Sequence, residues 1–343
     1  MYERKNLFSY IFYLFLTGIL TYIWGPQAGI ELWWILLLYS SILYIFSYIW
    51  KYIRKKDTPK FIHFFNMFLL KSSFWLCIGI CLFWGFMLVQ NELNPAKLPL
   101  YTLTNGQKVV YFQTMSHIGS QRFYTQVQNN IIAAKKDGAV LFFEWVRPGT
   151  KENQEAFNNA LWMKFDAELY NNFSRLYGVV AQDNDMFLKR ENEKDYNIDL
   201  SLDEVMDLYH KKNPPNQAQT HTLPQSADLN VYISQTLWAL SEKQLSLLQY
   251  MNQSLLNFII KHESLRENIL ENFWNPDIFS VILDERNKNL VNEILQSPEN
   301  KIFILYGLMH FSWVLQLLQD QDSQWKIIKR EDYTIIQKNA LSE

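Results

Sequence analysis

Three long apolar stretches in the first 90 residues constrain the fold more than any other feature of the chain. They cover about residues 7–24, 32–50 and 73–89. Each approaches the ~20 residues that a helix needs to cross a ~30 Å hydrocarbon core. Tryptophan and tyrosine residues stand at their ends, where amphipathic rings favour the membrane interface. A cleaved signal peptide is not expected, because two more apolar stretches follow the first. The sequence therefore predicts three transmembrane helices in a lipid bilayer.

Basic residues around these stretches predict their orientation. Residues 51–60 contain five Lys/Arg, whereas the first loop, 25–31, contains none. The positive-inside rule then places the N-terminus and the 51–72 loop in the cytoplasm. An odd number of spans leaves residues 91–343 on the other side. In a Gram-negative bacterium this would mean an inner-membrane protein with a periplasmic domain.

The composition changes near residue 90. Residues 91–343 hold 24 Lys/Arg against 31 Asp/Glu, a net charge of −7 without a basic stripe, so we expect no nucleic-acid partner. Both cysteines, Cys77 and Cys81, lie in the apolar part, so the polar part has no disulfide and no thiolate metal ligand. We predict a membrane domain, 1–90, and an exported domain, 91–343.

Alternating strand and helix patterns predict a layered α/β fold for the exported domain, with a mixed or mostly parallel sheet and flanking helices. Residues 91–100 are interpreted as a linker and 213–228 as a loop. Strands are predicted at 108–115, 139–146, 301–306 and 325–329. Helices are predicted at 120–136, 152–177, from Ser201 onward, and at 241–273, 285–296 and 311–319.

Two histidines occupy matching positions in this pattern. His117 and His310 each follow a β-prone stretch and precede a helical one. Open α/β sheets bind ligands beyond the carboxyl ends of their strands, and both imidazoles are expected there. A lone histidine in such a turn is more often satisfied by backbone groups. Two in matching positions favour a metal or acid–base site, because neutral imidazole is a common metal ligand.

Charged residues beside apolar runs add further candidates. Glu144 lies inside LFFEWV, where burying a carboxylate is costly unless it is paired, protonated or metal-bound. Arg286 is either a surface arginine or a clamp for a carboxylate or an oxyanion. Asp228 and Asn287 are candidates for orienting an imidazole from behind, although Asp228 fits a helix cap better.

Motifs of several enzyme classes are absent from the sequence. It contains no G-x-S-x-G, no Walker loop, no G-x-G-x-x-G and no H-E-x-x-H. The segment Ser323–Lys326 matches S-x-x-K, but in an expected edge strand. These absences argue against serine hydrolase, nucleotide-binding and zincin functions.

An ordered series of short motifs resembles the TraB/PrgY/TIKI family, also called TraB/GumN-like. The series covers most of residues 108–330. It consists of SHIGSQRFY (116–124), LFFEWVRPG (141–149), LYGVVAQ (176–182), ADLNVYISQ (227–235), LDERN (283–287) and YGLMH (306–310).

This resemblance implies a divergent α/β fold with paired G-x-x-H motifs, a glutamate in the second strand and an arginine. TIKI members are membrane-tethered, metal-dependent proteases that act outside the cell, with manganese or cobalt implied. PrgY- and TraB-type members are linked to shutting down peptide pheromone activity. The residues of this sequence that match the family's site are His117, Glu144, Arg286 and His310. One departure is Thr114, which stands where the second motif has Gly307; a β-branched residue would be strained there if the position required a positive φ.

The resulting hypothesis is a membrane-anchored, extracytoplasmic, metal-dependent peptidase-like hydrolase acting on peptides or protein termini. His117, His310 and Glu144 would bind a divalent ion (manganese, cobalt or zinc), and Glu144 and Arg286 would act in catalysis. One alternative is a non-catalytic module of the PrgY type that sequesters a peptide. Another is a structural membrane protein whose domain has lost its chemistry.

Overall fold

The computed structural model describes residues 9–18, 26–53, 60–161, 167–188, 195–213, 229–273 and 275–336. The chain forms two compact units, Met1–Phe86 and Met87–Glu343. The boundary between them falls close to the change in composition near residue 90.

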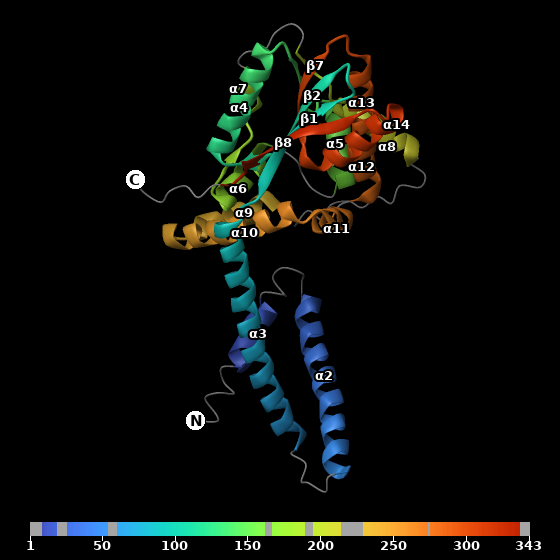
Figure 1. Ribbon diagram of the computed structural model, residues 1–343. Helices are drawn as coiled ribbons and strands as arrows, with labels where there is room; N and C mark the ends of the chain where they lie inside the picture. Colours follow the sequence, from blue (N-terminus) through green and yellow to red (C-terminus); the bar gives the residue numbers. More distant parts are fainter. Residues whose placement is uncertain are drawn as a thin grey trace. The chain divides into compact units, whose positions relative to one another are not determined.

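Among the described residues of the first unit, two helices, not three, are long and apolar enough to cross a membrane. They lie in α2 (Pro26–Ile53) and α3 (Phe61–Leu93), drawn in blue and teal in Figure 1. The described part of the first predicted span is the short helix Ser9–Gly18, which falls below the ~20 residues of a full span. The prediction of three spans is therefore corrected to two candidates among the described residues.

Helix α3 begins well before the predicted 73–89 and includes Lys71. The stretch that precedes Lys71 is almost wholly apolar and contains no proline or glycine, so nothing in it stops a helix. The predicted loop 51–72 was too long for this reason. The short helix Ser9–Gly18 satisfies polar groups of α3, because the Tyr13 hydroxyl donates to Ser72 Oγ at 2.7 Å.

The second unit is built on a mixed six-stranded sheet, which confirms the α/β prediction with flanking helices. Its strand order is β6-β4-β7-β2-β1-β8. The strands β6, β4, β7 and β2 are parallel, and β1 is antiparallel to both β2 and β8. In chain order the strands are β1 (Lys97–Thr104), β2 (Val109–Met115), β4 (Val140–Phe143), β6 (Tyr196–Asn197), β7 (Lys301–Gly307) and β8 (Lys326–Thr334).

Strand β1 was missed by the sequence analysis, which interpreted 91–100 as a linker. Helix α3 continues to Leu93, and β1 follows from Lys97. Proline in a strand argues for an edge, yet β1 has neighbours on both sides. Pro99 is accommodated because it pairs only with Asp332 of β8, while the pairing with β2 starts at Leu100.

Both faces of the central strands are buried, as predicted for the apolar run before Glu144. One face packs on α4 (Gln121–Lys136), which Ser120 caps by accepting from Phe123 N at 3.2 Å. The other face packs on α13 (Arg286–Gln296) and α14 (Phe311–Gln321). Figure 1 shows these helices on opposite sides of the sheet.

The remaining elements refine the prediction. The 152–177 segment forms two helices, 241–273 is divided at His262, and β4 ends at Phe143 rather than near residue 146. Of the predicted loop 213–228, residues 214–228 lie outside the described residues.

The remaining helices are α5 (Lys151–Leu161), α6 (Ala167–Tyr177), α7 (Asn184–Leu188), α8 (Leu202–Lys212), α9 (Leu229–Ala239), α10 (Glu242–Lys261), α11 (Glu263–Phe273) and α12 (Pro276–Ser280). A π-helical turn, Val281–Glu285, precedes α13, and a two-stranded ribbon pairs β3 (Ile118–Gly119) with β5 (Val180–Ala181).

Candidate functional site

The four parallel strands end at one edge of the sheet, and each is followed by a polar side chain. His117 follows β2, Glu144 follows β4, His310 follows β7, and Asp199 follows β6. Residue pairing fixes this alignment, since Met115 lies opposite Gly307 and Phe143 opposite Leu305. The carboxyl ends of parallel strands are where such sheets bind ligands.

Glu144 is the centre of the cluster. Its Oε1 accepts a hydrogen bond from Arg286 Nη2 at 2.6 Å, and its Oε2 accepts one from the Gly307 N–H at 2.6 Å. Its side chain is 14% exposed, so the carboxylate is largely out of water. Burial would raise the pKa of Glu144, but Arg286, the two histidines and the Gly307 N–H outweigh it and lower the pKa to about 2. Glu144 is therefore ionised at neutral pH.

Arg286 opens α13 immediately after the π-helical turn, an irregularity that is common at functional sites. Its Nε and Nη2 donate to Asp199 Oδ1 and Oδ2 at 2.7 and 2.6 Å. Its guanidinium also lies 5.5 Å from the centre of the Tyr306 ring. Arg286 therefore binds Asp199 in the bidentate geometry for which arginine is suited, and its Nη2 also donates to Glu144.

Asp199 is a site residue that the sequence analysis missed. Its side chain is fully buried, and it also lies 3.5 Å from the Tyr306 hydroxyl. Burial raises the pKa of Asp199 more than Arg286 lowers it. The signal was weak, because Asp199 follows a two-residue strand and stands beside the Ser201 capping box, where an aspartate is unremarkable.

His310 is buried, and its ring packs edge-on against Tyr306 with centroids 4.6 Å apart. Its Nδ1 lies 2.6 Å from Asn287 Oδ1. Because an amide oxygen accepts, Nδ1 carries the proton and the lone pair is on Nε2. Burial lowers the pKa of His310 to about 3, so the ring is neutral at pH 7. The predicted position of Asn287 behind an imidazole matches this geometry, although its functional role stays a prediction.

His117 lies at the rim of the cluster. The residue is exposed, and its ring lies 5.2 Å from that of Tyr170 on α6. Its surroundings are nevertheless crowded enough for desolvation to lower its pKa, an effect that Glu144 opposes and Arg286 reinforces. The cluster therefore brings together His117, Glu144, Arg286 and His310. The predicted Asp228 lies outside the described residues.

The two histidine motifs differ for a reason unrelated to a positive φ. Thr114 is buried within β2, and its hydroxyl donates to the Pro99 carbonyl at 2.8 Å. Gly307 has a φ of −56°, which any residue adopts. A Cβ at Gly307 would stand 3.4 Å from both Glu144 Oε2 and His310 Cδ2, which is ordinary van der Waals contact. The expected strain at Thr114 is thus absent.

The donor set fits a divalent cation in its chemistry. It offers two neutral imidazoles and an ionised carboxylate, the protonation states that ligands need, and His310 is held from behind by Asn287. Two carboxylates also face a single guanidinium, so a cation would balance the charge. In the part of the chain that the structure describes, no three His, Cys, Asp or Glu side chains are arranged as a ready-made metal site.

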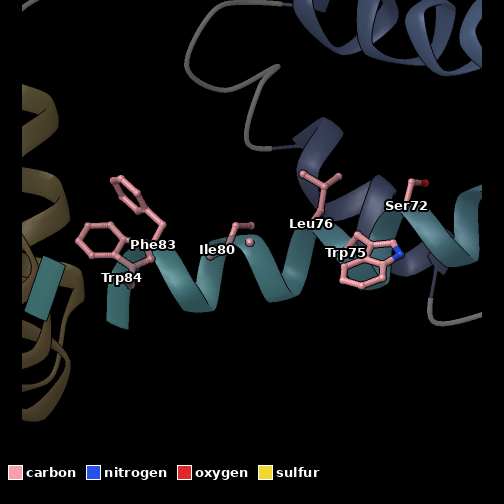
Figure 2. A pocket seen from close by; sticks show the side chains of 7 residues that line it. Ser72, Trp75, Leu76, Ile80, Phe83 and Trp84 are labelled. Atoms are coloured by element: carbon pink, nitrogen blue, oxygen red, sulfur yellow. The ribbon is translucent and has the colours of Figure 1, made fainter. Parts of the chain in front are cut away.

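A separate hollow lies along α3 in the first unit (Figure 2). Its lining is almost entirely apolar and contains no titratable side chain, which fits a lipid-facing helix rather than a reaction site. It is lined by Ser72, Trp75, Leu76, Gly79, Ile80, Phe83 and Trp84.

Comparison with protein-family models, curated proteins and solved structures finds no match to this chain. The family resemblance therefore rests on the motifs alone.

Proposed function

We propose that the protein is a membrane-anchored, metal-dependent hydrolase of the TraB/PrgY/TIKI type that cleaves peptides or protein termini at the Glu144 cluster. The observation that carries this proposal is the convergence of donors from β2, β4 and β7 on one edge of the sheet. That convergence joins residues far apart in the chain, such as Glu144 and Arg286, which 142 positions separate.

Each residue has a distinct task in this proposal. His117, His310 and Glu144 would hold a divalent ion, which would supply a nucleophilic water and polarise the scissile carbonyl. Glu144 is a better ligand than general base, because a carboxylate with a pKa of about 2 binds protons weakly. Asn287 fixes the His310 tautomer that leaves Nε2 free.

Arg286 acts mainly as a positioning residue, since Asp199 and Glu144 occupy its Nε and Nη2. These bonds hold the Glu144 carboxylate in one orientation. The proposal assigns its Nη1 to an oxyanion or a substrate carboxylate.

A peptide substrate suits the rim of the cluster. Trp145 and Val146 follow Glu144 directly and are 46% and 38% exposed, and the Tyr170 ring flanks His117. Ligand-binding sites commonly combine apolar and aromatic side chains with a small number of placed polar groups.

The membrane placement rests on α3 and the loop before it. Residues 54–60 carry four basic side chains, which favours a cytoplasmic loop. If the 54–60 loop is cytoplasmic and α3 crosses the bilayer, the second unit lies outside the cytoplasm. This holds whether or not the residues before that loop also cross the bilayer. In a Gram-negative bacterium that compartment is the periplasm.

The proposal is tested by removing metal from the full-length protein in detergent and then adding metal back. The protein is stripped with a chelator and incubated with a peptide library, and products are identified by mass spectrometry. Adding back manganese, cobalt or zinc should restore cleavage. Cleavage that is equal in stripped and reloaded protein would contradict the metal requirement.

A peptide-binding module without catalysis is the second candidate. One observation favours it: Glu144 and Arg286 already satisfy each other, and the described residues contain no ready-made metal site. In the same experiment, peptide retention without cleavage under every metal would support this alternative over the hydrolase.

A further inference from the structure

Helix α10 has three faces with different partners. The first face holds α6 and the core of the second unit. Gln249 and Gln253 donate to the carbonyls of Arg175 and Tyr177, each at 2.8 Å, and Leu256 packs against the core. Figure 1 shows α10 beside α6 and α9.

The second face of α10 holds the last turn of α3, residues that belong to the same unit. Tyr250 donates to Glu92 at 2.5 Å, and Asn257 bonds to Asn91. Lys261 donates to the Asn94 carbonyl at 2.8 Å. The spacing of these α10 residues, seven and four apart, puts them on one stripe of the helix.

The third face of α10 is apolar. Leu247, Met251, Leu255 and Phe258 recur at spacings of four, four and three, so they also form one stripe. At about 100° per residue this stripe lies nearly opposite the core-facing residues. Leu247 is 59% exposed and the others are partly exposed, and the stripe contains no charged residue.

The position of α10 on α3 indicates what covers this stripe. Residues 73–89 of α3 carry no charge, and the polar run begins at Gln90. The contacts with α10 also begin at Gln90, which accepts from Lys261 Nζ at 3.4 Å, so α10 crosses α3 where its apolar part ends. The side chains of α10 extend about 5–6 Å from its axis. They can therefore reach the level of the last apolar turn of α3.

The connection from α3 to the sheet is short. Only residues 94–96 separate α3 from β1, and Ala96 N donates to Asn257 Oδ1 at 3.1 Å. Trp238, at the end of α9 and shortly before α10, is 81% exposed. An exposed tryptophan is typical of the membrane–water interface.

We propose that the Leu247–Phe258 stripe of α10 lies in the headgroup region of the same bilayer that α3 crosses, so that α10 is an interfacial helix. This inference rests on the proposed membrane placement of α3 and not on the proposed chemistry. Because the stripe is apolar and uncharged, its binding depends on buried apolar area and needs no anionic lipid.

Site-specific fluorescence on the full chain tests the inference. Cys77 and Cys81 are replaced by alanine, and Leu247→Cys is labelled with an environment-sensitive dye. The protein is reconstituted in phosphatidylcholine vesicles, and flotation confirms that it is inserted. Ser246→Cys is the matched control, one residue earlier and turned about 100° around α10. Ser323→Cys, on the exposed turn before β8, reports full solvent access.

Quenchers in the acyl chains should quench the label at 247 at least threefold more than the labels at 246 and 323, and aqueous iodide should do the reverse. Iodide quenching at 247 equal to that at 323 would overturn the inference. A label at 247 shielded from both quenchers would also overturn it, because a protein partner would then cover the stripe. Failure to float with vesicles would instead refute the membrane placement itself.

Discussion

Nη2 of Arg286 lies 2.6 Å from Oε1 of Glu144 and 2.6 Å from Oδ2 of Asp199, so one nitrogen joins two carboxylates. The two partners are not equivalent. Asp199 takes two bonds from the guanidinium and its side chain is completely buried, whereas Glu144 takes one and keeps 14% exposure. Asp199 therefore supports the arginine, and the arginine orients Glu144.

The first prediction concerns stability. Asp199→Asn should lower the free energy of unfolding by about 3–5 kcal/mol, because it removes the bidentate partner of a buried guanidinium. Glu144→Gln should cost clearly less, since Arg286 keeps Asp199. Chemical denaturation of the detergent-solubilised full chain measures both. A larger loss for Glu144→Gln than for Asp199→Asn would contradict the assigned order of support.

The second prediction concerns Thr114. Thr114→Gly restores the glycine of the paired motif but removes a buried side chain and the hydrogen bond to the Pro99 carbonyl. It should lower stability by about 1–3 kcal/mol and should not raise activity. Melting temperature and peptide turnover are the readouts. A gain in turnover would show that the threonine impairs the site.

The third prediction is a dependence of stability on pH. The pKa of His310 is about 3 in the folded protein, held low by burial and by Arg286 and His117 against the opposing charge of Glu144. Its unfolded value is ~6.5, so the unfolded chain binds more protons below pH 6.5. The buried His310 therefore leaves the free energy of unfolding unchanged above pH 6.5. Below pH 6.5 it lowers that free energy progressively toward pH 3, by up to ~1.4 kcal/mol per pH unit.

His310→Gln should flatten this loss between pH 6.5 and 5, as followed by thermal unfolding. His210→Gln changes an exposed histidine of α8 and serves as the control that should keep the wild-type slope. Equal slopes in all three proteins would rule out a buried neutral His310. Below about pH 5, protonation of Glu144 should destabilise the protein further, because its pKa of about 2 is depressed.

The fourth prediction concerns topology. A reporter fused after residue 53 should be active in the cytoplasm, and one fused at the C-terminus should be active only outside it, because the 54–60 loop is basic. Cytoplasmic activity of both fusions would contradict a span at α3. A fusion within β1 is uninformative, since it would break the sheet.

Local patterns predicted the parts of the fold that depend on neighbouring residues. The Ser120 cap, the Ser201 capping box and the apolar β4 and β7 all follow from short-range preferences, and they are confirmed. β1 was missed because Pro99 and the adjacent polar run resemble a linker, and only the pairing with β2 and β8 makes the segment a strand.

The candidate site was predictable where a strand delivers a residue directly, as at His117, Glu144 and His310. Asp199 was not, because its importance comes from a contact 87 residues away with Arg286. The strand before it has only two residues, too few to show a pattern. Among the described residues the predicted number of spans was wrong for a different reason. The apolar stretch 7–24 predicted a full span, whereas its described part is the helix Ser9–Gly18, which is too short to be one.

The most direct test of the hydrolase account is a comparison of Glu144→Gln with wild type in metal-dependent cleavage of a peptide library by the full-length protein. Glu204→Gln is the matched control, a glutamate that pairs with Arg147 outside the cluster. The account predicts a loss of about a hundredfold or more for Glu144→Gln with the fold retained, because a neutral amide would hold the divalent ion more weakly. It predicts near wild-type turnover for Glu204→Gln. Wild-type turnover in Glu144→Gln would contradict the account.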